Sequence, residues 1–511
     1  MALEGIFLKY IIYLIIVALS VLVVLKYSKR AKKFLHMSQL EGYEAKEYFK
    51  WLKNNLDTAF NLKSAAKPVK KPLVMTERAN RLFRCNFLIN VILLAAFTSS
   101  IHLIFNSIPI STISFLAFSF IFYYLQPITV YLSTAIMNPY EAHINRGYYL
   151  QAQNKIMNRK DLTVIGITGS FGKTSTKFTV ATILSEKYKV LNTPESYNTP
   201  MGLSKVINNE LKDDVQVFVA EMGAKKIGEI RELAELAKPK IGIITSIGPV
   251  HIETFKNIDN IMKTKYELIE ELPTDGIAIF NYDNEYVRKL ADKTFKEKIL
   301  YGIELKDKVD IYVDDIEISE KGSSFTLKHK DGRSIRCTTK LLGKHNIYNI
   351  LAGVAAALAM GLNFEEIKEG IAKIEPVEHR LNLIDSPTGV IIIDDAFNSN
   401  PEGTKAALEV ISQFKEGKKF IITPGMIELG EMEDRYNKEF GANIGKVCDY
   451  AILVGEKRTK PIYEGLKESN FKEDHIFVVN SLDEATKIIG NLAKPKDVVL
   501  FENDLPDTYT E

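Results

Sequence analysis

The chain has few cysteines and almost no net charge, and both features limit the kinds of site and partner that it can have. Of 511 residues only three are cysteine (Cys85, Cys337 and Cys448), and no two of them form a C-x-x-C pair. A disulfide framework and a cysteine-based zinc site are therefore not supported, and a reducing compartment fits. The 66 basic and 64 acidic residues leave a formal net charge of +2, which gives no reason to expect nucleic acid as a partner.

The first 140 residues lack the alternating strand and helix pattern of the rest of the chain and carry three long apolar runs instead. These runs cover residues 6–25, 86–105 and 108–137, with Pro127 as a candidate kink in the third. Each is long enough to cross a hydrocarbon core of ~30 Å as a helix of ~20 residues. The sequence therefore predicts three transmembrane helices in residues 1–140.

Positive charge sets the predicted orientation of these helices. Fifteen lysines and arginines lie from Lys26 to Arg84, whereas the turn at residues 106–107 has no charge. Because positive loops stay on the cytoplasmic side, we expect a multi-pass protein of the cell membrane with everything after about residue 138 in the cytoplasm. A cleaved signal peptide is the alternative for the first run, but the basic segment follows that run instead of preceding it.

Within the basic loop, apolar residues recur at helical spacing among lysines. Tyr48, Trp51, Leu52 and Leu56 would share one face of a helix. This face could lie on the bilayer surface or pack against the cytoplasmic domain, and the pattern does not choose between the two.

From Leu162 onward, apolar strand runs alternate with helical patterns, which is typical of a parallel α/β sheet. Residues 309–339 alternate more like antiparallel strands, with a turn at 330–332. We expect a linker helix over 141–160, a P-loop three-layer ATPase-type central domain over 161–377, and a Rossmann-like C-terminal domain over 378–511. The predicted strands are 162–167, 215–220, 241–244, 390–394, 420–423, 451–454, 476–479 and 498–501.

The segment Thr168-Gly-Ser-Phe-Gly-Lys-Thr-Ser175 follows the first of these strands and precedes a helical pattern. Five residues separate Gly166 from Gly172 where the general phosphate-loop pattern has four, so the match is to a shorter G-x-x-G-K-[ST] loop that starts at Gly169. Glycines let backbone N–H groups close on phosphate oxygens, and the lysine and threonine suit phosphate and Mg²⁺. A surface turn that contains Gly-Lys-Thr by chance is disfavoured by the flanking strand and helix.

Further polar residues stand at strand ends and loops of this frame. They are Asn198, Glu221, His251, Lys265, Asn281, Asp283, His345, Asn346, Asn349, Arg380, Asp395, Asn398 and Asn400. Their order and spacing resemble the Mur ligase superfamily, and within it the branch that adds D-alanyl-D-alanine to UDP-N-acetylmuramoyl tripeptide. The resemblance begins near residue 161 and runs to the end of the chain.

The resemblance implies an ATP-dependent ligase in which a carboxylate becomes an acyl phosphate and an amine then displaces the phosphate. The implied catalytic residues are Lys173, Glu221, His251, Lys265 and Arg380. Mg²⁺ ligands would be Thr174, Glu221, His251 and Lys265, the last as a carbamate, which requires a neutral amine and so a lowered lysine pKa. The implied nucleotide contacts are Gly169, Ser170, Gly172, Lys173, Thr174, Ser175, Asn281, Asp283, His345, Asn346, Asn349, Asp395 and Asn398.

The chain also departs from the family pattern. Phe397 replaces the usual tyrosine of Asp-Ala-Tyr-Asn, residues 423–426 read Thr-Pro-Gly-Met where Leu-Gly-Asp-Met is usual, and residues 501–504 read Phe-Glu-Asn-Asp near the place of Lys-Gly-Ser. These changes leave the incoming amine open: an amino acid or a dipeptide. Because membrane spans stand where a UDP-binding domain is usual, the carboxylate acceptor is either a UDP-muramoyl peptide or a lipid-linked precursor.

Three other functions stay open at this point. A membrane-associated synthetase of the poly-γ-glutamate type belongs to the same superfamily. A nucleotide-binding scaffold for envelope synthesis would have no chemical reason to keep metal and phosphate groups together. An ATP-driven transporter is disfavoured, because the predicted spans lack intramembrane charged pairs.

Overall fold

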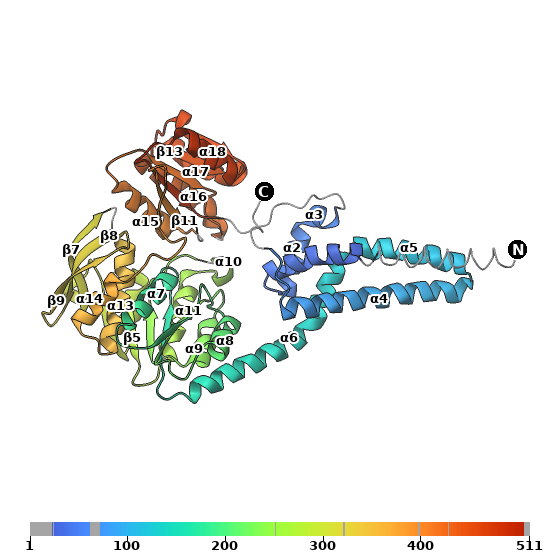
Figure 1. Ribbon diagram of the computed structural model, residues 1–511, viewed down its shortest axis with the longest axis horizontal. Coiled ribbons are helices and arrows are strands. Elements are labelled where there is room, and N and C mark those ends of the chain that lie inside the picture. Colours follow the sequence, from blue (N-terminus) through green and yellow to red (C-terminus); the bar gives the residue numbers. More distant parts are fainter. Residues whose placement is uncertain are drawn as a thin grey trace. The chain divides into compact units, whose positions relative to one another are not determined.

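The computed structural model describes residue 23 and residues 25–61, 72–250, 252–319, 322–396, 399–427 and 429–504 (Figure 1). Contacts divide the chain into two units, one up to Arg146 and one from Gly147 on. The first predicted span, 6–25, lies almost wholly outside the described residues, and so do His251, Phe397 and Asn398.

The N-terminal unit is helical. Residues 25–40 form a helix. The helices that follow are α2 (Ala45–Asn54), α3 (Leu56–Phe60), α4 (Glu77–Phe105), α5 (Ile108–Tyr124) and α6 (Gln126–Met157). The hydroxyl of Thr76 caps α4 by accepting a hydrogen bond from the backbone N–H of Ala79 at 3.2 Å. Asn106, in a left-handed conformation with φ of 44°, ends α4 and lets α5 fold back beside it (Figure 1).

The third apolar run does not form one straight span. Its helix breaks at Leu125, and α5 and α6 meet there at an angle of 72°. The reason is Pro127, which has no N–H to donate to the carbonyl four residues earlier and whose ring clashes with that carbonyl, so α5 cannot continue through it. Within the described residues, α4 alone is long and apolar enough to cross a membrane, and the bent pair adds at most a second such element. The linker helix expected over 141–160 is the end of α6.

Both interpretations of the basic-loop helix were wrong for its central residues. Tyr48 and Leu52 of α2 are buried, with Phe34 and Val130 in a small core inside the N-terminal unit. The hydroxyl of Tyr48 donates a hydrogen bond to the carbonyl of Pro127 at 3.0 Å. Leu56 lies outside this core and is exposed.

The second unit, hereafter the α/β unit, contains two β-sheets that are each covered by helices on both faces. The first has the strand order β2-β3-β1-β4-β5-β6-β7-β8-β9. Its strands are β1 (Thr163–Thr168), β2 (Val190–Asn192), β3 (Val217–Glu221), β4 (Ile241–Ile244), β5 (Ile277–Asn281), β6 (Glu297–Tyr301), β7 (Ile311–Ser319), β8 (Gly322–His329) and β9 (Ser334–Thr339). The first six pair in parallel, and β7 to β9 extend the same sheet as the expected antiparallel strands.

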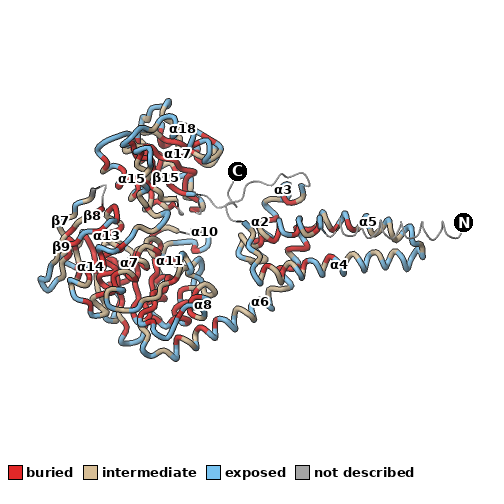
Figure 2. Tube along the Cα trace, in the orientation of Figure 1, coloured by how far each residue is buried: buried red, intermediate tan, exposed pale blue. Residues whose placement is uncertain are grey.

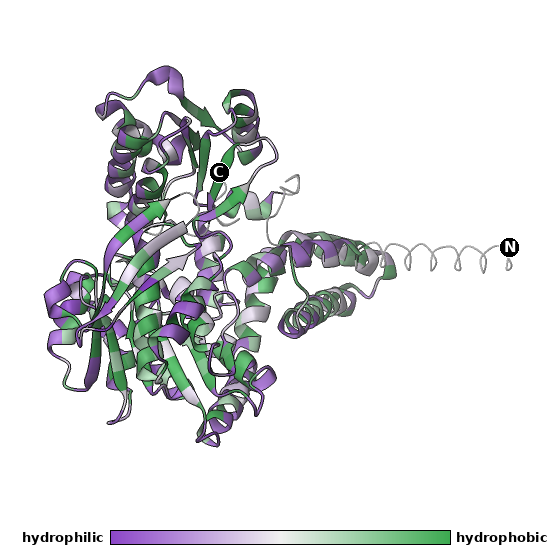
Figure 3. Cartoon of the chain, turned by 60° about the vertical axis from the view of Figure 1, so that its left-hand side comes forward, coloured by the Kyte–Doolittle hydropathy of each residue, from purple (hydrophilic) through white to green (hydrophobic). Residues whose placement is uncertain are grey.

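Helices cover this first sheet in two separate cores. One face packs against α7 (Lys173–Leu184), α13 (Lys344–Ala359) and α14 (Phe364–Ala372). The other packs against α8 (Pro200–Asn209), α9 (Glu229–Ala237), α11 (Ile258–Glu270), α12 (Glu285–Asp292) and the end of α6. The short helix α10 (Ile252–Phe255) precedes α11. Figure 2 shows the buried layer between the helices, and Figure 3 shows hydrophobic colouring along the strands.

The second sheet has the order β10-β11-β15-β12-β13-β14, with β10 antiparallel to an otherwise parallel sheet. Its strands are β10 (Asn382–Asp385), β11 (Ile391–Asp395), β12 (Lys419–Thr423), β13 (Tyr450–Val454), β14 (Ile476–Val479) and β15 (Val498–Glu502). Helices α15 (Pro401–Ser412), α16 (Glu433–Val447) and α17 (Glu456–Glu468) cover one face, and α18 (Leu482–Leu492) covers the other. The predicted three-layer α/β architecture is confirmed.

Candidate active site

The phosphate-loop motif forms a tight turn between β1 and α7. Gly169 has φ of 157°, and a Cβ atom there would lie 2.1 Å from the hydroxyl of Thr245. Gly172 has φ of 78° and sits at the N-terminus of α7. Only glycine fits both positions, because other residues rarely adopt these conformations and the first has no room for a side chain. Backbone N–H groups at the start of α7 are thus available for an anion.

Lys173 folds back over this loop. Its Nζ donates hydrogen bonds to the carbonyls of Gly169 at 2.9 Å and Ser170 at 3.2 Å. Burial lowers the pKa of Lys173, and Arg380 from the C-terminal part of the α/β unit lowers it further, whereas Glu221 acts in the opposite direction. Two cations and one carboxylate therefore converge on the loop, an arrangement suited to polyphosphate and a divalent cation.

Glu221 ends β3 and is almost fully buried, with 1 % of its surface exposed. Thr174 donates its hydroxyl to Oε2 at 3.0 Å, and the amide of Asn198 donates to Oε1 at 3.0 Å. A hydroxyl and a carboxylate in contact are oxygen ligands that Mg²⁺ accepts, so this pair fits a magnesium ion. In the described part of the chain, no cluster of three or more His, Cys, Asp or Glu side chains forms a complete protein-only metal site.

Lys265 lies on α11 with 2 % of its surface exposed. Burial lowers its pKa to about 7 and the nearby Lys173 contributes, while Glu229 and Glu267 act in the opposite direction. Glu267 also accepts hydrogen bonds from the backbone N–H groups of Gly228 at 2.8 Å and Arg231 at 3.0 Å, and so anchors the start of α9. A substantial share of Lys265 is thus neutral near pH 7, the state from which a carbamate forms.

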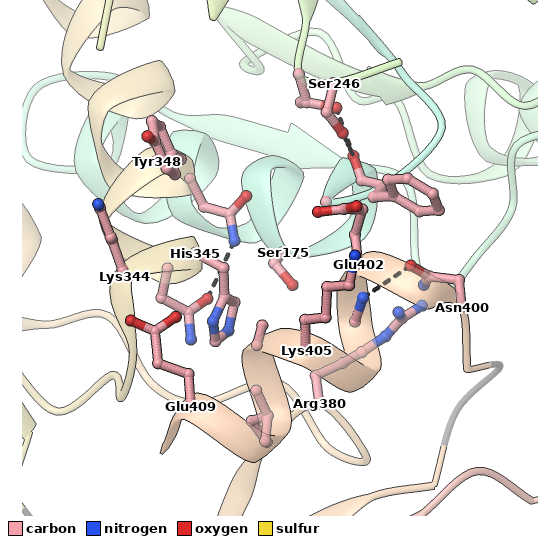
Figure 4. A pocket seen from close by; sticks show the side chains of 18 of the residues that line it. Ser175, Ser246, Lys344, His345, Tyr348, Arg380, Asn400, Glu402, Lys405 and Glu409 are labelled. Atoms are coloured by element: carbon pink, nitrogen blue, oxygen red, sulfur yellow. Dashed lines mark hydrogen bonds between the residues drawn. The ribbon is translucent and has the colours of Figure 1, made fainter. Parts of the chain in front are cut away.

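A cavity of about 420 Å³ brings most of the predicted nucleotide residues together. Figure 4 shows Ser175 and His345 on one side of it, with Arg380 and Lys405 reaching in from the other. The predicted residues that line it are Gly172, Ser175, Asn281, Asp283, His345, Asn346, Asn349, Arg380 and Asp395. Gly169, Ser170, Lys173, Thr174, Glu221 and Lys265 are not part of this lining.

The wall formed by α13 is held by side-chain amides. Asn349 donates to Oδ1 of Asn346 at 3.0 Å and accepts from the hydroxyl of Thr176 at 3.0 Å, which ties α13 to α7. Burial lowers the pKa of His345 to about 4, so its ring is neutral at physiological pH and can both donate and accept a hydrogen bond. These are groups that suit recognition of a nucleotide base.

Asp283 lines the cavity as predicted, and its carboxylate is held by protein donors. Its carboxylate accepts hydrogen bonds from the backbone N–H groups of residues 303, 304 and 305 and from the hydroxyl of Tyr348. Because protein donors already occupy both oxygens, Asp283 shapes the cavity wall. Asn400 likewise caps α15, accepting from the N–H of Gly403 at 2.9 Å, as a turn-forming asparagine would.

Arg380 enters the cavity from a constrained segment. Its neighbours His379 and Leu381 have φ of 59° and 47°, conformations that cost free energy for residues with a Cβ. His379 contacts Asp394 at 2.7 Å, and the N–H of Leu381 donates to Asp395 at 3.1 Å. These two carboxylates thus fix the backbone on either side of Arg380.

Comparison with known proteins agrees with this site. A model of the Mur ligase middle domain matches residues 167–357, and one of the Mur ligase glutamate ligase domain matches residues 379–502. A Bacillus subtilis protein named UDP-N-acetylmuramoyl-tripeptide--D-alanyl-D-alanine ligase is 31% identical over 340 residues, which are 66% of this chain and 72% of that protein. The chain belongs to the Mur ligase family. It is an ATP-dependent ligase that forms carbon–nitrogen bonds.

Other relatives of this Mur ligase are similar over more than half of the chain. The Escherichia coli protein of the same name is 30% identical over 58% of this chain and 65% of its own length. Among solved structures, MurF from Acinetobacter baumannii matches with a TM-score of 0.65 and 25% identity over 71% of this chain and 78% of that one. MurF from Thermotoga maritima in complex with ADP matches with a TM-score of 0.63 and 27% identity over 70% and 80%.

Two buried charges of this Mur ligase were missed by the sequence analysis. Lys177 is fully buried, and its Nζ lies 3.4 Å from Oε2 of Glu221. It follows Lys173 by one helical turn, so the shared helix face was a usable signal. Glu502 lines the cavity and is also buried. It was noticed only as a departure from the family's Lys-Gly-Ser pattern, because its neighbours in space are distant in sequence.

Proposed function

We propose that this ligase joins the carboxylate of a UDP-N-acetylmuramoyl tripeptide, or of its lipid-linked counterpart, to the amino group of D-alanyl-D-alanine. The names of its relatives support this substrate class. One observation carries the proposal: Arg380 and Glu221, from distant parts of the α/β unit, both act electrostatically on Lys173 of the phosphate loop. Phosphoryl transfer depends on such positioning and charge neutralisation.

ATP with Mg²⁺ supplies the phosphoryl group that converts the acceptor carboxylate into an acyl phosphate. The loop N–H groups and Lys173 bind phosphate oxygens and take up the charge that develops on them. Thr174 and Glu221 hold the magnesium ion, and Asn198 and Lys177 orient Glu221 through the hydrogen bond and ion pair described above. Arg380 adds positive charge from the opposite side of the cavity and helps to exclude water from the acyl phosphate.

Lys265 and His251 complete the proposed magnesium ligands, with Lys265 as a carbamate. The lowered pKa and the burial of Lys265 support the carbamate, since a neutral, desolvated amine is the form that adds CO₂. The remaining predicted contacts, Gly169, Ser170, Gly172, Ser175, Asn281, Asp283, His345, Asn346, Asn349 and Asn398, are proposed to surround the nucleotide. Asp395 lines the same cavity.

We also propose that residues 1–140 insert into the membrane and leave the central and C-terminal domains, 161–377 and 378–511, in the cytoplasm. The polarity of α4 supports insertion. Its buried face carries Asn86 and Asn90, hydrogen-bonded to one another and to Thr129, whereas its exposed face carries large apolar residues (Figure 2). The exposed residues include Phe87, Leu88, Val91, Ile92, Phe97, Leu103, Ile104 and Phe105. Polar side chains inside and apolar ones outside suit a lipid environment.

Product analysis tests the acceptor. Detergent-purified full-length protein is given ATP, Mg²⁺, D-alanyl-D-alanine and either the UDP-linked tripeptide or its lipid-linked counterpart, and the amide product is identified by mass spectrometry. A product from the UDP-linked acceptor supports a membrane anchor on an ordinary ligase, and a product only from the lipid-linked acceptor supports a membrane region that binds substrate. No amide from either acceptor contradicts the proposed substrate class.

A further inference from the structure

Glu502 and Asp395 form a pair of carboxyl groups at one edge of the second sheet. They end the neighbouring parallel strands β15 and β11 and are direct register partners there. Both line the cavity that Arg380 enters. Two acidic side chains are thus held side by side next to a cation, at the strand ends where open α/β sheets bind ligands.

Glu502 has one satisfied oxygen and one unsatisfied oxygen. Oε1 accepts a hydrogen bond from the hydroxyl of Ser399 at 2.6 Å. Oε2 is buried and, among the described residues, has no hydrogen-bond partner unless one carboxyl of the pair carries a proton. Burial and the neighbouring carboxylate raise the pKa of Glu502, and burial raises that of Asp395 as well. Each carboxyl of the pair therefore binds a proton more readily than an isolated carboxyl does.

The segment after β15 fixes this pair in place. Asn503, with φ of 73°, accepts a hydrogen bond from the N–H of Ser399 at 3.2 Å and donates its side-chain amide to the carbonyl of Gly425 at 2.6 Å. Its backbone N–H donates to the carbonyl of Asp395 at 3.1 Å. The loops after β11, β12 and β15 are joined by one residue, so the carboxyl pair is preorganised.

We propose that the Asp395–Glu502 pair binds the ammonium group of the incoming amine and accepts a proton from it. The proposal rests on the proposed function and deepens it. A carboxylate of this buried pair attracts a cation and repels phosphate, which distinguishes this corner of the cavity from the phosphate loop.

Amide formation at this pair begins with the loss of a proton from the amine. An α-amino group with a pKa near ~8 arrives mostly as ammonium and cannot attack until it loses a proton. One carboxylate of the pair takes that proton, and the neutral nitrogen attacks the carbonyl carbon of the acyl phosphate. The carbon–nitrogen bond forms, the carbon–oxygen bond to phosphate breaks with its electron pair going to phosphate, and the second nitrogen proton leaves with the phosphate.

Steady-state kinetics of Glu502→Gln tests this assignment. Glutamine keeps the shape, can accept from Ser399 and can donate to Asp395, so the fold is retained, but it removes the proton acceptor. With D-alanyl-D-alanine as the amine, we expect the KM for the dipeptide to rise at least tenfold and the KM for ATP to stay within twofold. Glu416→Gln, which removes an exposed carboxylate of the same domain, is expected to change neither.

Trapping of the acyl phosphate with hydroxylamine separates this proposal from the proposed function. Glu502→Gln is expected to form acyl phosphate from ATP and the UDP-linked tripeptide at the wild-type rate, because the pair acts only on the amine. A raised KM for ATP with an unchanged KM for the dipeptide would overturn the proposal and assign the pair to the nucleotide. No acyl phosphate from the wild-type protein would overturn the proposed function, and with it the substrate on which this assignment rests.

Discussion

Thr174 and Glu221 are joined by a hydrogen bond of 3.0 Å, although one opens α7 and the other ends β3. The contact places a hydroxyl and a buried carboxylate beside the phosphate loop, where we propose that the magnesium ion binds. Lys177 and Asn198 also contact this carboxylate. The proposed metal site is therefore built on rigid elements.

Thr174→Val is expected to raise the magnesium concentration needed for half-maximal activity by about tenfold, because a metal ligand and a donor to a buried carboxylate are both lost. Thr174→Ser keeps the hydroxyl and should behave nearly as the wild type. A titration of ATP turnover against Mg²⁺ measures both. Equal magnesium dependence in the valine and wild-type proteins would argue against Thr174 as a ligand.

Carbamylation of Lys265 has a direct spectroscopic test. Protein equilibrated with ¹³C-bicarbonate should show a carbamate signal by ¹³C NMR near pH 7 to 8, since the pKa of Lys265 is lowered to about 7. Lys265→Met should lose that signal. The exposed Lys205 of α8 supplies the control, and Lys205→Met should keep the signal. A signal that survives in the Lys265 variant would come from another amine.

The buried His345 predicts a pH dependence of stability. Its pKa is lowered to about 4, below the ordinary value of 6.5, so between these pH values the unfolded chain binds more protons than the folded protein. The stability that the neutral His345 ring contributes is therefore fully present above about pH 6.5 and is lost as the pH falls toward 4. The melting temperature of His345→Gln should fall less than that of the wild type over this pH range. The exposed His143→Gln is the control and should follow the wild type. The same pH dependence of the melting temperature in the wild type and His345→Gln would contradict the lowered pKa of His345.

The proposed membrane topology places the turn between α4 and α5 outside the cell. A cysteine at Ser107 should react with a membrane-impermeant maleimide in intact cells, whereas one at Lys46 should react only after permeabilisation. The native Cys85, Cys337 and Cys448 should stay unlabelled in intact cells. Protection of the residue-107 cysteine in intact cells, with labelling after permeabilisation, would place the turn on the cytoplasmic side.

The sequence predicted those features that depend on local pattern. The strands at 241–244 and 476–479 coincide with β4 and β14, because buried β-branched runs with polar ends leave little choice of boundary. The glycines of the phosphate loop were readable for the same reason. The break at Leu125 lies two residues before Pro127, which the sequence had indicated as a kink. By contrast, the burial of Tyr48 depends on the packing of helices distant in sequence.

The Asp395–Glu502 pair is another contact between residues distant in sequence that local pattern could not predict. Asp395 was predicted as a nucleotide residue from its motif, but its neighbour Glu502 follows from the strand order, in which β15 lies between β11 and β12. Periodicity in one segment carries no information on which strand will be inserted beside it. The hydrogen bonds of Asp283 could not be predicted for the same reason, because the N–H groups that donate to its carboxylate come from the loop after β6.

The most direct test of ligation is ADP formation by the full-length protein with ATP and Mg²⁺, measured with the UDP-linked tripeptide and D-alanyl-D-alanine together and with each omitted in turn. We expect sustained turnover only when both are present. The rate should fall at least a hundredfold in Lys173→Ala, which lacks the phosphate-loop cation. The exposed Lys205→Ala should retain wild-type turnover. ATP turnover that is indifferent to both substrates, or that persists in Lys173→Ala, would contradict the account.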